Sequence, residues 1–234
     1  MNLAPAEIKK EGPYFDLPIA IGILISTEAI KQQGLEDTIF IGELSLDGKL
    51  MKVNGILPIC IEAKKLNIKR IIILKENVQE AAIVNGIEII GVNNLTEIVD
   101  FLNGEIVINE EKIDAEEILN KNNKYALDFS DVKGQENVKR ALEISAAGGH
   151  NVLLIRLSSV LARRIPSILP DLTFEEALEI TKIHSISGKL TLKCPLITTR
   201  PFRAPHHTIS PISLIGGGKV PKPGEISLAH YGVL

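Results

Sequence analysis

Short runs of branched apolar residues, separated by segments with helical spacing, most strongly limit what this chain can fold into. KRIIILK (69–75), GIEIIGV (86–92) and NVLLI (151–155) are rich in Ile, Leu and Val. Such runs are typical of short strands buried on both faces, and the helical segments between them supply the crossovers that parallel strands require. The sequence therefore predicts a mixed α/β fold.

Local patterns predict the other elements. Apolar residues at helical spacing predict helices over 56–66, 77–84, 94–102, 136–147 and 158–169, and over 16–31 with Asp16 as N-cap. A strand is expected over 38–45, followed by a turn at Asp47-Gly48 and a short second strand. Thr173 and Glu176 have capping-box spacing, which predicts that a further helix begins there.

An acidic connector divides the chain. Residues 105–117 contain six acidic residues and one lysine. A stretch of this composition packs poorly against a core. We therefore predict a first domain over 1–104, a linker over 105–124 and a second domain over 125–234.

Composition limits the class of protein. Cys60 and Cys194 lie outside any C-x-x-C spacing, so neither a disulfide scaffold nor a zinc site is expected, and a reducing cytoplasm fits best. The longest apolar run, Ile19–Ile25, is far shorter than the roughly 20 residues of a membrane span. A net charge of -3 neither indicates nor excludes nucleic-acid binding, because a local patch can act by itself.

The segment after NVLLI is the place where a phosphate-binding loop is expected. That loop, G-x-x-x-x-G-K-[ST], uses glycines, a lysine and a hydroxyl to hold phosphates and magnesium. Here the run continues as RLSSVLARR, without glycine or lysine. Serines do not supply the backbone freedom of glycine, so we expect no working nucleotide site. The candidates for a degenerate one are Gln135, Asn151, Arg156, Ser158 and Ser159.

Several segments resemble the ComM/YifB family of bacterial magnesium-chelatase-like AAA+ ATPases. They are DFSDVKGQENVKRALEISAAGGHNVLLI (128–155), TFEEALEITKIHSISG (173–188), LITTRPFRAPHHTIS (196–210) and PKPGEISLAHYGVL (221–234). NLAPAEIKKEGPYFDLPIAIGIL (2–24) resembles the N-terminal domain of the same family, which is similar to the Lon protease domain. The resemblance covers essentially the whole chain, and residues 198–218 are its most specific part.

The resemblance implies a fold and a parent function. It implies a partial Lon-protease-like α/β domain, of the ribosomal S5 domain 2 type, followed by a partial AAA+ P-loop NTPase αβα domain. It also implies ATP-dependent DNA processing in recombination or natural transformation by a ring, hexameric in the intact family, with ATP and Mg²⁺ as cofactors. Because the phosphate loop is replaced and the chain stops before the family's Walker B strand, we expect a fragment that binds no cofactor and lacks ATP hydrolysis.

The same resemblance bears on proteolysis. It places the Ser-Lys dyad of Lon-type enzymes at Tyr14 and near Leu57, and neither side chain can serve. Lys9, Lys10 and Lys52 are interpreted as surface charges. No catalytic residue and no protease activity are therefore predicted.

The C-terminal stretch carries the candidate DNA contacts. Residues 191–234 hold five lysines and arginines against one glutamate, and Gly216–Gly218 with Pro221–Gly224 predict a hairpin. In related AAA+ proteins such a hairpin projects into the ring channel, where contacts to phosphates would be independent of sequence; the alternative is an ordinary solvated basic loop. The candidates are Arg203, His206, His207, Lys219 and Lys222. The adjacent histidines are expected on opposite faces of a strand, so no metal site is predicted, and His150 is interpreted as a turn residue.

Three functions stay open at this point. The first is a motor fragment that binds nucleotide weakly. The second is an interaction module that joins a ring of intact relatives, and the third is a non-functional remnant. A truncated domain exposes apolar strands, so we expect the C-terminal half to aggregate or to lose fixed packing.

Overall fold

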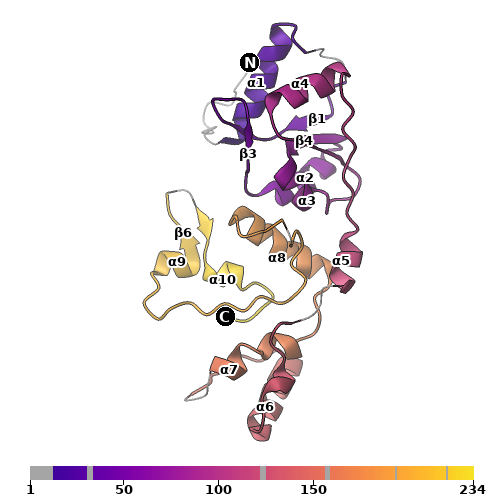
Figure 1. Cartoon of the computed structure of the whole chain (residues 1–234). Helices are drawn as coiled ribbons and strands as arrows, with labels where there is room; N and C mark the ends of the chain where they lie inside the picture. The colour runs from indigo at the N-terminus through magenta and orange to yellow at the C-terminus, as the bar shows by residue number, and fades with distance from the viewer. Residues whose placement is uncertain (1–12, 31–33, 122–124, 156–158, 193, 220) are drawn as a thin grey trace. The chain divides into compact units, whose positions relative to one another are not determined.

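The computed structural model describes residues 13–30, 34–121, 125–155, 159–192, 194–219 and 221–234 (Figure 1). The chain forms two compact units. Unit 1 comprises Met1–Asp114 and Gly188–Pro195, and unit 2 comprises Ala115–Ser187 and Leu196–Leu234. Unit 1 is thus discontinuous in sequence, because the short segment Gly188–Pro195 belongs to it. The fold is α/β, with a parallel sheet in unit 1.

Unit 1 is built on three parallel strands in the order β1-β4-β5. They are β1 (Thr38–Phe40), β4 (Arg70–Leu74) and β5 (Glu88–Val92), with Ile71 opposite Ile89 and Ile72 opposite Ile90. The strands predicted from KRIIILK and GIEIIGV are confirmed. The strand predicted over 38–45 is interrupted, because Gly42 turns its carbonyl to the Leu17 N–H at the start of the first helix. Its second part forms β2 (Glu43–Leu44), which pairs antiparallel with β3 (Leu50–Met51) across the predicted turn.

Helices α1 (Asp16–Ser26), α2 (Ile56–Lys65), α3 (Val78–Ala81) and α4 (Leu95–Asn103) surround this sheet, with 3-10 turns at Pro13–Phe15 and Lys75–Asn77 (Figure 1). The first helix is shorter than predicted and begins at Asp16 instead of being capped by it. It ends early because the Ser26 and Thr27 hydroxyls bond back to the Ile23 carbonyl and Glu28 takes a positive φ. Helix α4 begins as predicted, since Asn94 Oδ1 accepts from the Glu97 N–H at 2.8 Å.

Both faces of the sheet are buried. On one face Ile72, Leu74, Ile90 and Val92 form a core cluster with residues of α1 and α4, including Leu17, Ile21 and Ile98. Alternate residues of the strands, Ile71, Ile73 and Ile89, point to the other face and are equally buried. The glycine of β5 lies on that second face. A Cβ added at Gly91 would come within 2.5 Å of Val78 Cγ2, so the absence of a side chain lets α3 approach the strand closely.

Unit 2 is mainly helical. Its elements are α5 (Ala115–Lys121), α6 (Glu136–Gly148), α7 (Ser159–Ala162), α8 (Phe174–Ile186), α9 (Pro211–Ile215), β6 (Gly216–Gly217), β7 (Lys222–Pro223) and α10 (Glu225–Leu228), with 3-10 turns at Phe129–Asp131 and Ile165–Ile168. The capping box at Thr173 and Glu176 is confirmed. The helix predicted over 158–169 is broken into α7 and a 3-10 turn, because Pro166 has no N–H to continue the helical bonding.

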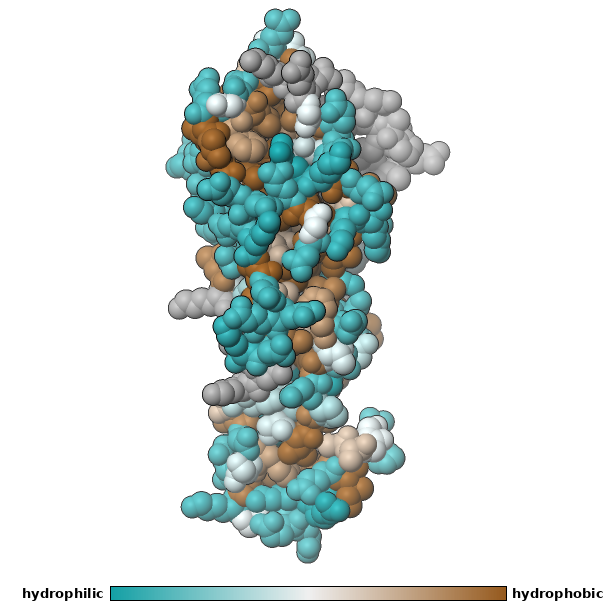
Figure 2. All heavy atoms as spheres, turned by 90° about the vertical axis from the view of Figure 1, so that its right-hand side faces the viewer, coloured by the Kyte–Doolittle hydropathy of each residue, from teal (hydrophilic) through white to brown (hydrophobic). Residues whose placement is uncertain are grey.

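The strand predicted from NVLLI is absent. Residues 151–155 have no regular secondary structure, and Val152, Leu153 and Ile155 are 45%, 83% and 70% exposed. A strand satisfies its backbone groups only through a neighbour, and no described segment of unit 2 pairs with this one. Figure 2 shows brown, hydrophobic surface at the lower end of the view, where α6 and α7 lie in Figure 1. The apolar run at 151–155 is therefore more exposed to solvent than its composition predicts.

Candidate nucleic-acid interface

The candidates for a degenerate nucleotide site are dispersed. Gln135 adopts a left-handed conformation at the N-cap of α6, whereas Asn151 follows the other end of this helix and is exposed. A helix of 13 residues rises roughly 20 Å, so these two side chains do not form one site. Ser159 is the first residue of α7. Arg156 and Ser158 lie outside the described residues.

The donor set at this position does not fit a nucleotide triphosphate. A phosphate loop works because a strand and a helix hold consecutive backbone N–H groups in place. Here residues 151–155 do not form a strand, and the sequence RLSS that follows them contains neither glycine nor lysine. Among the described residues, no three His, Cys, Asp or Glu side chains come together as a metal site.

The two positions that would carry a Lon-type dyad have structural roles in unit 1. The Tyr14 hydroxyl donates to the Asn54 carbonyl at 3.1 Å. The Leu57 side chain is fully buried, and its backbone N–H donates to Glu80 Oε1 at 2.9 Å, at the start of α2. Lys52 is exposed, whereas Lys9 and Lys10 lie outside the described residues. The two positions hold a phenol and an alkyl group, which do not form a nucleophile and base.

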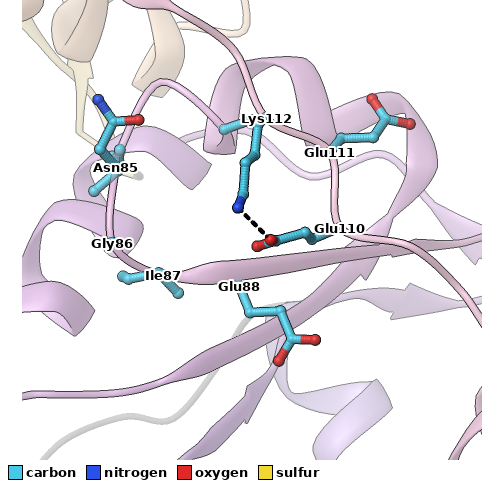
Figure 3. Close-up of a pocket in the computed structure, with 9 residues that line it drawn as sticks. Asn85, Gly86, Ile87, Glu88, Glu110, Glu111 and Lys112 are labelled. Atoms are coloured by element: carbon cyan, nitrogen blue, oxygen red, sulfur yellow. Dashed lines mark ion pairs between the residues drawn. The ribbon is translucent and has the colours of Figure 1, made fainter.

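A hollow of about 280 Å³ in unit 1 has three glutamates and one lysine among its lining residues. Figure 3 shows Asn85–Glu88 on one side and Glu110–Lys112 on the other, with Lys112 directed at Glu110. These two groups form an ion pair with a separation of 2.5 Å, and Glu111 accepts from Gln79 Nε2 at 3.2 Å. Glu88 pairs with Arg70 at 2.7 Å instead. Each charged side chain of the hollow is thus engaged by a neighbouring group.

The predicted C-terminal hairpin is present, and its lysines are exposed. Gly216–Gly217 pair antiparallel with Lys222–Pro223. Lys219 lies in the turn of this hairpin and Lys222 on its second strand, and both are exposed. Residues 204–224 contain no Asp or Glu. We name this stretch the 204–224 loop; it is a surface segment with positive charge and no compensating carboxylate of its own.

Arg203 closes the base of this loop. Its guanidinium donates two hydrogen bonds to the Glu225 carboxylate, Nε to Oε2 at 2.5 Å and Nη2 to Oε1 at 2.7 Å. The carboxylate raises the pKa of Arg203 above its usual value through these hydrogen bonds. The Arg203 backbone N–H also donates to the Val233 carbonyl at 2.8 Å. Arg203 is thus directed at a neighbouring carboxylate, and its DNA contact stays a prediction.

The two histidines of the loop lie in a turn, not on a strand. Their ring centroids are 4.2 Å apart, so the expectation that they face opposite sides of a strand is wrong. His206 Nδ1 lies 2.7 Å from Thr208 Oγ1 and 3.4 Å from the Thr208 backbone nitrogen. One ring nitrogen of His206 is therefore occupied within the loop. His150, interpreted as a turn residue, follows the left-handed Gly149 after α6.

Arg200 was not among the predicted site residues, although it organises unit 2. Its side chain is 10% exposed. Its guanidinium donates to the carbonyls of Pro170 at 2.6 Å, Tyr231 at 2.8 Å and Asp171 at 3.3 Å, and to Glu176 Oε2 at 3.0 Å. One of the positive charges counted for DNA binding is therefore used internally. The single acidic residue of 191–234, Glu225, was the available sequence signal that Arg203 is also paired.

No helix within the described ranges has both the length and the apolar character needed to cross a membrane. Comparison with known proteins gives two matching family descriptions. Residues 128–234 match "Magnesium chelatase, subunit ChlI", and residues 1–77 match "Subunit ChlI of Mg-chelatase".

Three relatives illustrate the similarity. The competence protein ComM of Haemophilus influenzae is 41% identical over all of this chain and 47% of its own length. YifB of Escherichia coli is 42% identical over all of this chain and 46% of its own length. Lon protease 2 of Bacillus subtilis is 34% identical over 45% of this chain and 18% of its own length. The chain thus spans about half the length of the ComM and YifB relatives that it matches.

Proposed function

The chain belongs to the ComM/YifB family of magnesium-chelatase-like proteins, and from this we propose that it is a DNA-contacting member of that family which does not hydrolyse ATP by itself. In this proposal residues 1–104 form a Lon-protease-like domain and residues 125–234 an AAA+-type domain. The parent activity is ATP-dependent DNA processing by a ring. The name of the Haemophilus relative, a competence protein, supports a role in DNA handling.

One observation carries the DNA contact. Two exposed lysines, Lys219 and Lys222, stand on a hairpin within a 21-residue stretch that contains no acidic residue. Lysines placed in this way neutralise phosphates without reading base sequence. Arg203 contributes indirectly, because its ion pair with Glu225 fixes the two ends of the stretch.

The proposed absence of ATP hydrolysis rests on the sequence after residue 155. The sequence there offers two serines and one arginine in place of the glycines and lysine of a phosphate loop. A loop of this kind can present charge, but it does not wrap a triphosphate. Titration calorimetry of the whole chain with ATP and Mg²⁺ is expected to give no binding heat up to millimolar nucleotide. Saturable micromolar binding would contradict this part of the proposal.

The DNA contact is tested by fluorescence anisotropy with a labelled single strand of mixed sequence. The double variant Lys219→Gln/Lys222→Gln should reduce the slope of log K against log salt by about 1.4, since each phosphate contact contributes roughly 0.7 on single strands. The matched control, Lys52→Gln/Lys64→Gln, removes two exposed charges from unit 1 and should leave the slope unchanged. Equal slopes for the two double variants would refute the proposed contact.

A second function is favoured by the uncovered apolar run. Val152 and Leu154 line a groove of about 820 Å³ in unit 2, together with Leu142, Ile165 and Val233. Exposed apolar surface of this kind marks association sites or aggregation, which supports the interaction module that joins intact relatives. Leu153→Asp should weaken association with an intact relative in sedimentation velocity, whereas Val107→Asp, at a similarly exposed site of unit 1, should not. Equal sedimentation of wild type and Leu153→Asp with the relative would exclude this module.

A further inference from the structure

The short helix of the 204–224 loop exposes two isoleucines. Ile212 and Ile215 are 63% and 66% exposed, and their spacing places them on the same side of α9. The helix is held at its start, where Ser210 Oγ accepts from the Ser213 N–H at 3.1 Å and the Leu214 N–H donates to the Ser210 carbonyl at 3.0 Å. The two branched side chains therefore project from a defined backbone.

A closely packed backbone junction joins the helix with the isoleucines to the strand with Lys222. Helix α9 runs directly into β6, whose residue Gly217 pairs with Lys222. The packing at this junction leaves no room for side chains. A Cβ added at Gly216 would lie 2.7 Å from the Lys222 carbonyl oxygen, and one added at Gly224 would lie 2.4 Å from the Gly216 nitrogen. Apolar and cationic groups are thus presented together.

The small area of apolar surface at the two isoleucines favours a nucleic acid over a protein as the partner. Two isoleucine side chains offer on the order of 100 Å² each. A stable protein interface needs roughly 800 Å² from each partner, so these residues are too few to form one. A wedge between base steps needs only one or two branched side chains, and lysines beside it hold the phosphates. The lack of carboxylates in residues 204–224 suits a polyanion.

We propose that Ile212 and Ile215 insert between bases, so that the preferred partner of the 204–224 loop is DNA with unpaired or weakly stacked bases, such as a junction of duplex and single strand. This inference rests on the proposed DNA contact of Lys219 and Lys222. The lysines supply affinity, and the isoleucines select the DNA structure and unstack it. A fully paired duplex should bind more weakly, because unstacking its internal steps costs free energy.

The test uses the whole chain and a junction DNA that carries 2-aminopurine at the first unpaired position, with anisotropy measured in the same samples. Wild type should bind the junction at least fivefold more tightly than a blunt duplex and should raise the 2-aminopurine fluorescence at least twofold. Ile212→Ser/Ile215→Ser should bind the junction about fivefold more weakly, no more tightly than the blunt duplex, and should lose the rise in fluorescence. The matched control Ile144→Ser/Ile186→Ser, which changes two other exposed isoleucines of unit 2, should behave as wild type.

The outcomes separate the two proposals. Absence of any anisotropy change with wild type would refute the proposed DNA contact and the wedge with it. Binding that depends on Lys219 and Lys222, but a fluorescence rise that survives Ile212→Ser/Ile215→Ser, would overturn the wedge alone. Equal affinity of wild type for the junction and the blunt duplex would also overturn it.

Discussion

Replacing Arg200 should loosen the start of α8 far more than replacing an arginine on the surface. Its guanidinium satisfies three backbone carbonyls and the Glu176 carboxylate from a side chain that is 10% exposed. A lysine keeps the charge but lacks the branched guanidinium. At roughly 1 kcal/mol for each hydrogen bond lost, Arg200→Lys should lower the stability of this region by about 2 kcal/mol. A methionine also leaves Glu176 without a cation. Because Glu176 is 24% exposed and still accepts from the Thr173 N–H, we place the cost of Arg200→Met at about 3 kcal/mol.

Hydrogen exchange measured by mass spectrometry on the native chain reads this cost directly. Since about 1.4 kcal/mol corresponds to a factor of ten, peptides from α8 should exchange about 30-fold faster in Arg200→Lys and about 100-fold faster in Arg200→Met. Peptides from β4 and β5 lie in unit 1 and serve as the internal reference. Arg140→Met, at an arginine that is 73% exposed and paired with Glu143, should change exchange less than twofold. An acceleration of less than fivefold in Arg200→Met would refute the reasoning.

Three further predictions concern unit 1. Gly91→Ala should lower the free energy of unfolding by about 2 kcal/mol in urea titration, because the new Cβ meets Val78 Cγ2 at 2.5 Å; Gly91→Ala combined with Val78→Ala should show a smaller loss than the sum of the two single variants. Burial, with the Glu80 charge adding to it, raises the pKa of Cys60 to about 12, so a thiol reagent at pH 8 should label exposed Cys194 but reach Cys60 only after unfolding. Hydrogen bonds from Ser45 and Lys49 lower the pKa of Asp47 to about 2. The contribution of Asp47 to stability is therefore complete above pH ~4 and is lost as pH falls toward 2. A carbon-13 titration of its carboxyl group will follow the protonation, and Asp47→Asn will abolish this part of the pH dependence of stability.

The elements predicted correctly are those whose causes are local. The isoleucine runs of β4 and β5 and the caps at Asn94 and Thr173 depend on a few neighbouring residues. NVLLI has an equally strong local pattern, yet it does not form a strand, because a strand also needs a partner that no local pattern supplies. Propensity alone could not reveal this difference.

The sequence predicted which charged residues lie near the candidate site, but not which of them are paired with carboxylates. The hairpin and its exposed lysines follow from glycine and proline positions. Arg200 and Arg203 looked equivalent to those lysines in sequence, but the fold brings Glu176 and Glu225, which lie 24 and 22 residues away in sequence, into contact with them. Ion pairs across such separations depend on tertiary packing, which a count of charges does not contain.

The closure of the 204–224 loop by Arg203 and Glu225 has an evolutionary consequence. A segment whose two ends are joined at its base can lengthen, shorten or change its tip without disturbing the domain beneath it. The two closing residues do not share this freedom, because losing either one breaks a bidentate ion pair between partly buried side chains. Related sequences should therefore vary most in the length and composition of the hairpin tip. The arginine and the glutamate should be kept, lost or exchanged for another complementary pair together.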